Sequence, residues 1–311
     1  MRIGVILPIG HQESLDRPFS YGEIRAFAQR AEEAGFDSVW LYDHLLYRRP
    51  GKPTTGVWEA TIIWAALAEA TSRVELGALV LCTAFRNPSV TAKLAATLDE
   101  VSGGRITLGL GAGWHEPEFA AFGIPFDHRV SRFEEACKII VPLVREGKVD
   151  FQGQYYSAPD CEILPRPSRR IPVLIAGNGP RMLQITARYA DQWNTAWLGS
   201  VEALAPYRDA LHAACAEVGR DPGTLEITVG VNVAFPSVAE PPERASDPLR
   251  FLTGSVSEVA AGLRGYRDAG VSHVICWLYP VNEASIDLLA EAVQQVRAGW
   301  TLRSVDAISG R

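Results

Sequence analysis

An aspartate and a histidine stand side by side at the end of an apolar run. The run Ser38–Tyr42 has the length and composition of a buried strand, and Asp43 and His44 follow it directly. A histidine can donate or accept a proton near neutral pH, and a neighbouring carboxylate can orient it. The pair therefore predicts a site of proton transfer. A structural aspartate beside a histidine satisfied by the backbone is the alternative that these residues leave open.

A second candidate is a glycine-rich turn between an apolar run and a helical segment. Proline in the first helical turn leaves free backbone N–H groups that can bind an anion, and an arginine stands beside them. The turn therefore predicts a phosphate site, with an ordinary glycine-rich turn as the alternative. A methionine at the place of the third glycine argues against a dinucleotide-binding fingerprint. The residues of this turn are Gly177, Asn178, Gly179, Pro180, Arg181 and Met182.

Two other types of catalytic site find no support in the sequence. The string Trp114–Glu118 contains His115 and Glu116, but Phe119 stands where a zinc-binding His-Glu-x-x-His motif needs its second histidine. We therefore predict no metal site. No Gly-x-Ser-x-Gly string is present, so a serine hydrolase is not indicated either.

Composition narrows the partners that the chain is expected to have. The 311 residues carry a formal net charge of −6, which gives no general attraction to nucleic acid or to anionic lipid. The five cysteines are scattered, which fits a reducing cytoplasm better than a disulfide framework. No apolar run reaches the roughly 18 residues of a membrane-spanning helix. We therefore expect a cytoplasmic protein that acts on a small molecule, without nucleic-acid or membrane partners.

Two kinds of segment alternate along the whole chain and would position these residues. Short β-branched runs are each followed by an amphipathic segment with helical spacing. Eight such units predict an α/β fold, a (β/α)8 TIM barrel in one domain over residues 1–311, in preference to a doubly wound open sheet. The carboxyl ends of barrel strands form the functional face, so both candidate sites would share it. The runs begin near Ile3, Ser38, Val74, Ile106, Val173, Asp191, Glu226 and Ser272.

The sequence also predicts two insertions in the barrel and the starting points of three helices. Residues 148–171 are expected to form a hairpin and loop inserted before strand five, and the proline-rich residues 236–254 an excursion after strand seven. A serine followed three residues later by a glutamate predicts a capping box, in which both side chains satisfy free N–H groups at a helix start. The three such pairs are Ser20 and Glu23, Ser131 and Glu134, and Ser255 and Glu258.

Five stretches of the chain follow one another in an informative order. They are Asp43–His44; Leu76–Val80 with Phe85–Pro88; Ser102–Arg105; Gly109–Trp114 with Glu116 and Glu118; and Ala176–Gly179 with Ala187–Asp191. Together they resemble the luciferase-like monooxygenase superfamily, specifically its coenzyme F420-dependent oxidoreductase branch. The similarity is dense over about residues 1–235 and looser beyond them.

The resemblance implies a barrel that binds a deazaflavin. Asp43 and His44 would lie at its ring, with His44 as an acid or base during hydride transfer, and a non-proline cis peptide between Leu79 and Val80 would support the ring. Trp114 stands where the F420-dependent sugar-phosphate dehydrogenases of this family have a proton-accepting glutamate. Glu116 lies nearby, out of register with that glutamate, and is the second catalytic candidate. The implied cofactor contacts are Asp43, His44, Leu79, Val80, Cys82, Gly113, Trp114, Gly177, Asn178, Gly179, Arg181 and Met182.

The function that the resemblance implies is F420-dependent hydride transfer between the deazaflavin and a small organic substrate. An apolar or aromatic substrate is expected, because Tyr47, Trp58, Trp197 and Trp277 would form the pocket wall. An FMN-dependent monooxygenase that receives reduced flavin from a partner reductase is the first alternative. A non-catalytic flavin-binding relative is the second. A homodimer is expected in each case.

Overall fold

Eight parallel strands close into a barrel in the computed structural model, which describes residues 1–12, 15–241 and 247–309. The ring closes because the last barrel strand pairs with the first, and the fifth pairs with the fourth. The predicted (β/α)8 barrel is therefore confirmed, and the open doubly wound sheet is excluded. In ring order the strands are β1 (Arg2–Ile6), β4 (Ser38–Leu41), β7 (Glu75–Ala78), β9 (Ile106–Gly111), β12 (Val173–Ala176), β13 (Gln192–Leu198), β14 (Glu226–Ala234) and β16 (His273–Tyr279).

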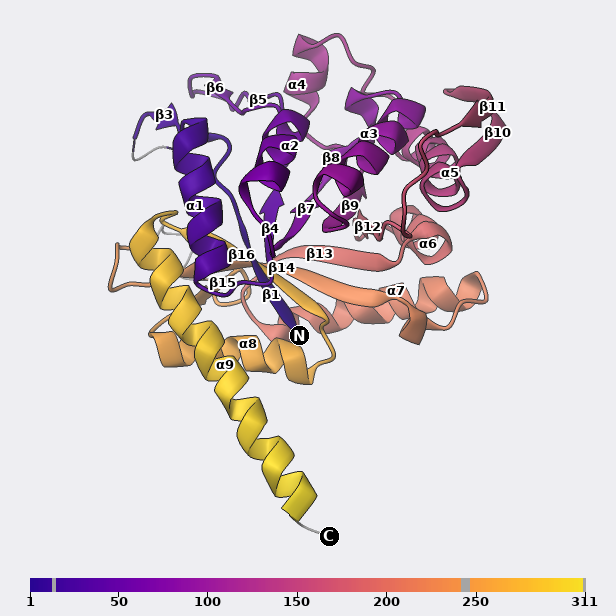
Figure 1. Cartoon of the computed structure of the whole chain (residues 1–311). Coiled ribbons are helices and arrows are strands. Elements are labelled where there is room, and N and C mark those ends of the chain that lie inside the picture. Colours follow the sequence, from indigo (N-terminus) through magenta and orange to yellow (C-terminus); the bar gives the residue numbers. More distant parts are fainter. Residues whose placement is uncertain (13–14, 242–246, 310–311) are drawn as a thin grey trace.

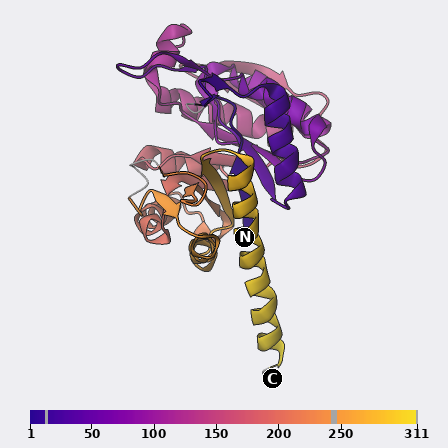
Figure 2. The same cartoon turned by 90° about the vertical axis from the view of Figure 1, so that its left-hand side faces the viewer.

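Helices surround this barrel, and the last of them extends beyond its body toward the C-terminus (Figure 1, Figure 2). The helices are α1 (Tyr21–Glu33), α2 (Ala60–Ala70), α3 (Pro88–Val101), α4 (Glu116–Ala121), α5 (Arg129–Glu146), α6 (Pro180–Tyr189), α7 (Ala205–Glu217), α8 (Val256–Asp268) and α9 (Glu283–Ser309). Short 3-10 turns cover Thr83–Phe85, Val201–Leu204 and Pro222–Thr224. Among the described helices, none is both long enough and apolar enough to cross a bilayer.

Two of the three predicted capping boxes form. Ser20 and Ser255 each begin a helix, with the reciprocal bonds from glutamate that the motif requires. The prediction for Ser131 is wrong, because α5 already begins at Arg129, after His128 in the left-handed region at a φ of 51°. Ser131 therefore lies inside the helix rather than at its start.

The barrel interior is closely packed and includes a buried polar chain near the amino ends of the strands. Trp40 is fully buried and lies against Gly77, where a Cβ atom would sit 2.3 Å from the indole ring. The indole N–H donates to the Ser38 hydroxyl at 2.7 Å, and that hydroxyl also bonds the buried ring of His273 at 2.7 Å. Burial keeps the pKa of His273 well below its usual value, so this buried ring is neutral.

Four excursions leave the barrel. The hairpin predicted within residues 148–171 is present as β10 (Lys148–Gln152) and β11 (Ser157–Glu162). In the excursion expected at 236–254, β15 (Phe251–Thr253) pairs in parallel with β14, and residues 242–246 lie outside the described residues. Two hairpins were not predicted, and both follow early barrel strands. They are β2 (His11–Gln12) with β3 (Arg17–Pro18), and β5 (Leu46–Tyr47) with β6 (Thr55–Gly56), and a short strand β8 (Leu81–Cys82) pairs with β9.

Candidate functional site

A cavity of about 1170 Å³ opens among the loops that follow the barrel strands. Its position is the one expected for the functional face of a barrel. Residues from both halves of the chain line it, and most of the residues predicted from the sequence are among them. The predicted residues in its lining are Asp43, His44, Tyr47, Leu79, Val80, Cys82, Gly113, Trp114, Gly177, Asn178, Met182, Trp197 and Trp277.

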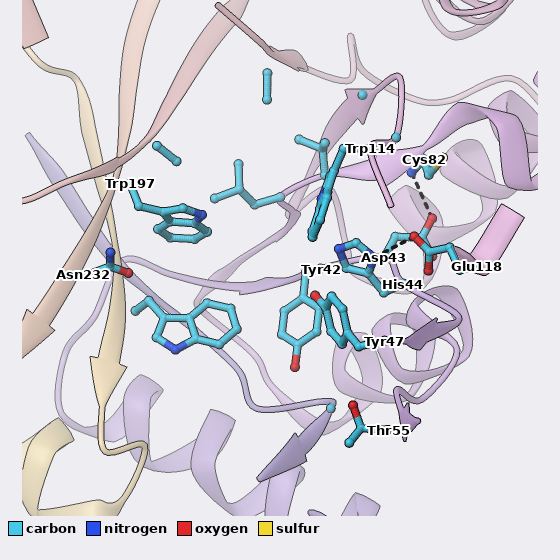
Figure 3. Close-up of a pocket in the computed structure, with 18 of the residues that line it drawn as sticks. Tyr42, Asp43, His44, Tyr47, Thr55, Cys82, Trp114, Glu118, Trp197 and Asn232 are labelled. Carbon is cyan, nitrogen blue, oxygen red and sulfur yellow. Dashed lines mark hydrogen bonds and ion pairs between the residues drawn. The ribbon is translucent and has the colours of Figure 1, made fainter. Parts of the chain in front are cut away.

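One side of the cavity, which we call the charged wall, consists of Asp43, His44, Trp114 and Glu118 (Figure 3). The Nδ1 atom of His44 lies 2.8 Å from an Oε1 atom of Glu118, whose side chain is only 1% exposed. The second carboxylate oxygen of Glu118 accepts the Leu45 N–H at 2.8 Å. Because a carboxylate only accepts, we assign the imidazole proton to Nδ1, which leaves Nε2 on the far side of the ring from Glu118.

Asp43 is held by a buried ion pair. Its carboxylate accepts hydrogen bonds from both terminal nitrogens of Arg86, at 2.6 and 3.1 Å, and from the Cys82 N–H at 3.0 Å. Arg86 in turn contacts the carboxylate of Glu59, the side chain that caps α2. Burial raises the pKa of the Asp43 carboxyl, and the guanidinium and the Cys82 N–H oppose that shift. The bonds leave little freedom to the Asp43 side chain.

His115 lies behind the charged wall and anchors the β5–β6 hairpin. Its Nε2 atom accepts the Arg48 N–H at 3.0 Å, and the residue is 7% exposed. Burial lowers the pKa of His115, and the nearby His44 and Arg49 act in the same direction, whereas Glu118 opposes them. A neutral imidazole is required for this bond, because a protonated Nε2 cannot accept.

The bottom of the cavity, between β7 and β9, is formed largely by backbone atoms. The Leu79–Val80 peptide is cis, as predicted, and both residues line the cavity. Gly113 has a φ of +76°, and a Cβ atom there would lie 2.7 Å from the Cys82 sulfur and 2.6 Å from the Phe119 ring. Burial raises the pKa of the Cys82 thiol to about 12, so this thiol is not a nucleophile near neutral pH.

The glycine-rich turn before α6 contributes only part of its residues to the cavity. Gly177, Asn178 and Met182 line the cavity, and the side-chain oxygen of Asn178 is buried without a partner. Gly179 and Arg181 do not line it, and Arg181 instead bonds Ser131 at 2.9 Å and Glu134 at 2.8 Å.

The bond from Arg181 lowers the pKa of the Glu134 carboxyl. The arginine that does line the cavity near this turn is Arg129, at the start of α5. Its guanidinium donates to the carbonyl of Gly113 and lies 4.2 Å from the centre of the Phe126 ring.

The opposite side of the cavity, which we call the aromatic wall, consists of Trp197, Phe251, Trp277 and Tyr279. Trp197 comes from β13, Phe251 from β15, and the other two from β16. Figure 3 places Trp197 and Asn232 across the cavity from Trp114 and His44. None of the described cavity-lining residues from 176 onward carries a carboxylate or an imidazole.

Besides Gly179 and Arg181, two further predicted site residues lie outside the cavity lining. Glu116 is exposed at the start of α4, whereas Glu118 on the same helix is buried against His44. Trp58 is 46% exposed, and its indole N–H donates to the Phe19 carbonyl at 2.7 Å. Among the residues that the structure describes, no group of three or more His, Cys, Asp or Glu side chains could hold a metal ion.

Sequence reasoning missed Glu118 and Arg86 as parts of the site. Glu118 belongs to a segment that the sequence did single out, but nothing local distinguishes it from Glu116. Arg86 follows the short 3-10 turn after β8 and stands 43 residues from its partner Asp43. Its signal was an arginine directly after an otherwise apolar segment, which favours a paired cation.

Comparison with known proteins gives a consistent result. The model of the luciferase-like monooxygenase family matches residues 1–291. The F420-dependent glucose-6-phosphate dehydrogenase of Kineococcus radiotolerans is 30% identical over 316 aligned positions, which cover 88% of this chain and 91% of that protein. The pyrimidine monooxygenase RutA of Stutzerimonas stutzeri is 30% identical over 238 positions, which cover 71% and 65%.

The fold has close counterparts among solved structures. An F420-dependent secondary alcohol dehydrogenase in complex with an F420-acetone adduct superposes with a TM-score of 0.79 at 20% identity, over 95% of this chain and 98% of the other. A coenzyme F420-dependent tetrahydromethanopterin reductase from Methanopyrus kandleri superposes with a TM-score of 0.74 at 18% identity, over 93% and 97%. At these identities the likeness is one of fold.

Proposed function

The chain belongs to the luciferase-like monooxygenase family, and from this premise we propose that it is a coenzyme F420-dependent oxidoreductase. It transfers hydride between the deazaflavin and a small organic substrate of apolar or aromatic character. The relative from Kineococcus radiotolerans, which is 30% identical to this chain, is named as an F420-dependent dehydrogenase. The observation that carries the proposal is the His44–Glu118 pair, a proton-transfer group held at the cavity.

The cavity has features that fit a large planar cofactor. The side-chain oxygen of Asn178 is buried in its lining without a partner, and a bound cofactor would satisfy it. The left-handed turn at Gly113 brings backbone close to the cavity where a side chain would not fit. Asp43, Val80 and the backbone near Gly113 would hold the ring.

Anion binding would fall to polar side chains of the cavity lining beside α5 and α6. Asn178 and the half-buried guanidinium of Arg129 would meet the phosphate side of the cofactor. When bound, a deazaflavin supplies two-electron hydride chemistry, because carbon replaces the reactive ring nitrogen of a flavin. Arg181 is left to its bonds with Glu134 and Ser131.

The protein's own contribution to the chemistry is proton transfer. His44 takes or gives the proton of the substrate at Nε2, while Glu118 holds Nδ1 and stabilises the imidazolium that forms. Asp43 cannot share this task easily, because Arg86 and the Cys82 N–H occupy its oxygens. Glu116 is exposed and away from the cavity lining, so the carboxylate of the pair is Glu118.

An FMN-dependent monooxygenase is the second candidate, and the match to a pyrimidine monooxygenase favours it. Titration of the full-length protein with F420 and with FMN separates the two, because each cofactor reports its own binding by a change in absorbance or fluorescence. We expect F420 to bind at least tenfold more tightly. Tighter binding of FMN, together with oxygen-dependent turnover of reduced FMN, would establish the second candidate instead.

A non-catalytic relative would bind the cofactor without any reaction. Reduced F420 mixed with the protein and a panel of ketones should be oxidised with at least one of them. The protein would be a non-catalytic relative if it bound F420 tightly, no ketone oxidised reduced F420, and none of the matching alcohols reduced oxidised F420. The homodimer and the cytoplasmic location stay predictions.

A further inference from the structure

The aromatic wall is an ordered cluster with Trp277 at its centre. The Trp277 ring lies 5.2 Å from Tyr42, 5.6 Å from Trp197 and 6.3 Å from Tyr279, measured between ring centroids. The Trp197 ring stands nearly perpendicular to it, at 83°. Phe251 extends the cluster at 5.2 Å from Tyr279. These distances are those of favourable aromatic pairs, so the rings hold one another in place.

The backbone beneath Trp197 is adapted to its ring. Gly230 on β14 lies under the indole, and a Cβ atom at this position would sit 3.1 Å from two ring carbons and 2.7 Å from the Ala196 methyl group. Despite this support Trp197 stays 37% exposed, and it lines the cavity. A rigid aromatic ring exposed to a concave space is the usual form of a site for a hydrophobic ligand.

Among the described residues, the polar side chains that line this side of the cavity are those of Asn194, Thr195, Asn232, Arg250 and Tyr279, and Arg250 is the charged one. The hydroxyl of Thr195 is buried in the cavity lining without a partner, two residues before Trp197. The nearby cation, Arg250, is 73% exposed and lies 3.5 Å from Asp247. An anionic substrate group would need a desolvated cation, which Arg250 in this setting does not provide. The neutral hydroxyl and amide groups on this side suit an uncharged polar group such as a carbonyl or an alcohol.

We propose that the aromatic wall is the substrate subsite and that it takes a neutral, planar aromatic alcohol or carbonyl compound rather than a sugar phosphate. The ring of the substrate lies against Trp197 and Trp277, and its oxygen meets the Thr195 hydroxyl. This inference rests on the proposed function, because the charged wall across the cavity would serve the cofactor and the proton. Trp197 and Trp277 then determine specificity, which the oxidoreductase assignment alone does not state.

The test compares two ketones that share a carbon skeleton. Acetophenone is planar and aromatic, whereas methyl cyclohexyl ketone has the same connectivity of carbon and oxygen atoms but a saturated ring. Calorimetric titration of the full-length protein, with and without F420, measures both dissociation constants, and glucose 6-phosphate serves as the charged competitor. We expect acetophenone to bind about tenfold more tightly than methyl cyclohexyl ketone and to be unaffected by glucose 6-phosphate.

Variants test whether the preference for acetophenone depends on the aromatic wall. Trp197→Leu should abolish it, and the partial exposure of Trp197 limits the packing that this variant loses, whereas Trp277→Leu tests the cluster centre. Trp58→Leu is the matched control, because Trp58 is also partly exposed, at 46% against 37% for Trp197, but lies outside the cavity lining, and it should keep the preference. Equal affinity for the two ketones, or an unchanged preference in Trp197→Leu, overturns the inference.

The F420 titration separates the two levels of the proposal. If F420 binds but the ketones are not distinguished, the subsite assignment fails while the proposed function stands. If F420 does not bind but acetophenone is still preferred through Trp197, the subsite assignment holds and the proposed cofactor is wrong.

Discussion

The charged wall and the aromatic wall face each other across one cavity but are built in different ways. In the charged wall Glu118 and Asp43 make directional bonds of 2.6 to 3.1 Å to a ring nitrogen, a guanidinium and two backbone N–H groups. In the aromatic wall the contacts are between rings, at centroid distances of 5.2 to 6.3 Å. Directional bonds fix atoms, whereas ring contacts fix a surface.

The two walls should therefore differ in how strongly a substitution affects them. A buried hydrogen bond that loses one partner leaves the other unsatisfied, so small changes in the charged wall should have large effects. Aromatic packing is less directional, so a change in the aromatic wall should alter which ligand binds more than whether the protein works. The barrel holds the two walls together, because the charged wall follows β4 and β9, while the aromatic wall lies on β13, β15 and β16.

Replacement of His44 should give the largest effect. His44→Ala removes the group that moves the proton, so we expect the single-turnover rate of hydride transfer to fall by about 10²–10⁴-fold, roughly 3–5 kcal/mol of transition-state stabilisation. The dissociation constant of F420 should stay within about tenfold. His212→Ala, at an exposed position on α7, is the control and should leave both quantities unchanged. A normal single-turnover rate in His44→Ala would make this histidine purely structural.

Asp43 should matter for stability as well as for the cofactor. Asp43→Asn removes the more deeply buried of the two carboxylates that pair with Arg86 and leaves only Glu59, so we expect a loss of up to about 3 kcal/mol of the free energy of unfolding. Urea unfolding measures this loss. Glu162→Gln breaks the exposed pair with Arg166 and should cost less than about 1 kcal/mol. Equal losses in the two variants would show that burial does not distinguish the pairs.

A comparison of two glutamates on α4 should give a smaller effect. Glu118→Gln weakens a charge-assisted bond to His44, which is worth about 1.5–3 kcal/mol, so the hydride-transfer rate should fall by roughly 10- to 100-fold. Glu116→Gln should change the rate by less than about twofold, because Glu116 is exposed. Glu118→Asp should recover part of the loss if the carboxylate orients the ring. A larger loss in Glu116→Gln would restore the assignment made from the sequence.

The barrel could be predicted because its signal is repeated eight times, with β-branched runs and helical spacing in strict alternation. The hairpins β2–β3 and β5–β6 could not, since two-residue strands carry no periodicity. Both hairpins contribute to the cavity rim, so the sequence reasoning described the floor of the site better than its edge.

The choice between Glu116 and Glu118 shows what could not be predicted about the site from the sequence. Successive residues of a helix turn by about 100°, so residues two apart point to nearly opposite sides. Which of them faces His44 depends on where α4 begins, and that is fixed by packing rather than by local sequence. The same reason explains Arg181, whose approach to Glu134 depends on the early start of α5.

The smallest expected effect is a dependence of the free energy of unfolding on pH, which we expect beside the charged wall and not at the aromatic wall. Because burial lowers the pKa of His115, its contribution to the free energy of unfolding is complete above about pH 6.5 and is lost as the pH falls from there toward its folded pKa. The loss is at most about 1.4 kcal/mol per pH unit. His115→Gln keeps an acceptor for the Arg48 N–H but cannot titrate, so its stability should fall less steeply with acid than that of the native chain.

His273 shifts in the same direction, so only the difference between the native chain and this variant reports on His115. The aromatic wall should show no such dependence, because Tyr42 beside Trp277 has its pKa raised by burial and stays protonated at every pH up to 9. The dissociation constant of acetophenone should therefore change by less than about twofold between pH 6.5 and pH 9. A steep change in that range would mean that a titrating group of the charged wall also contacts the aromatic ligand, and the separation of the two walls would fail.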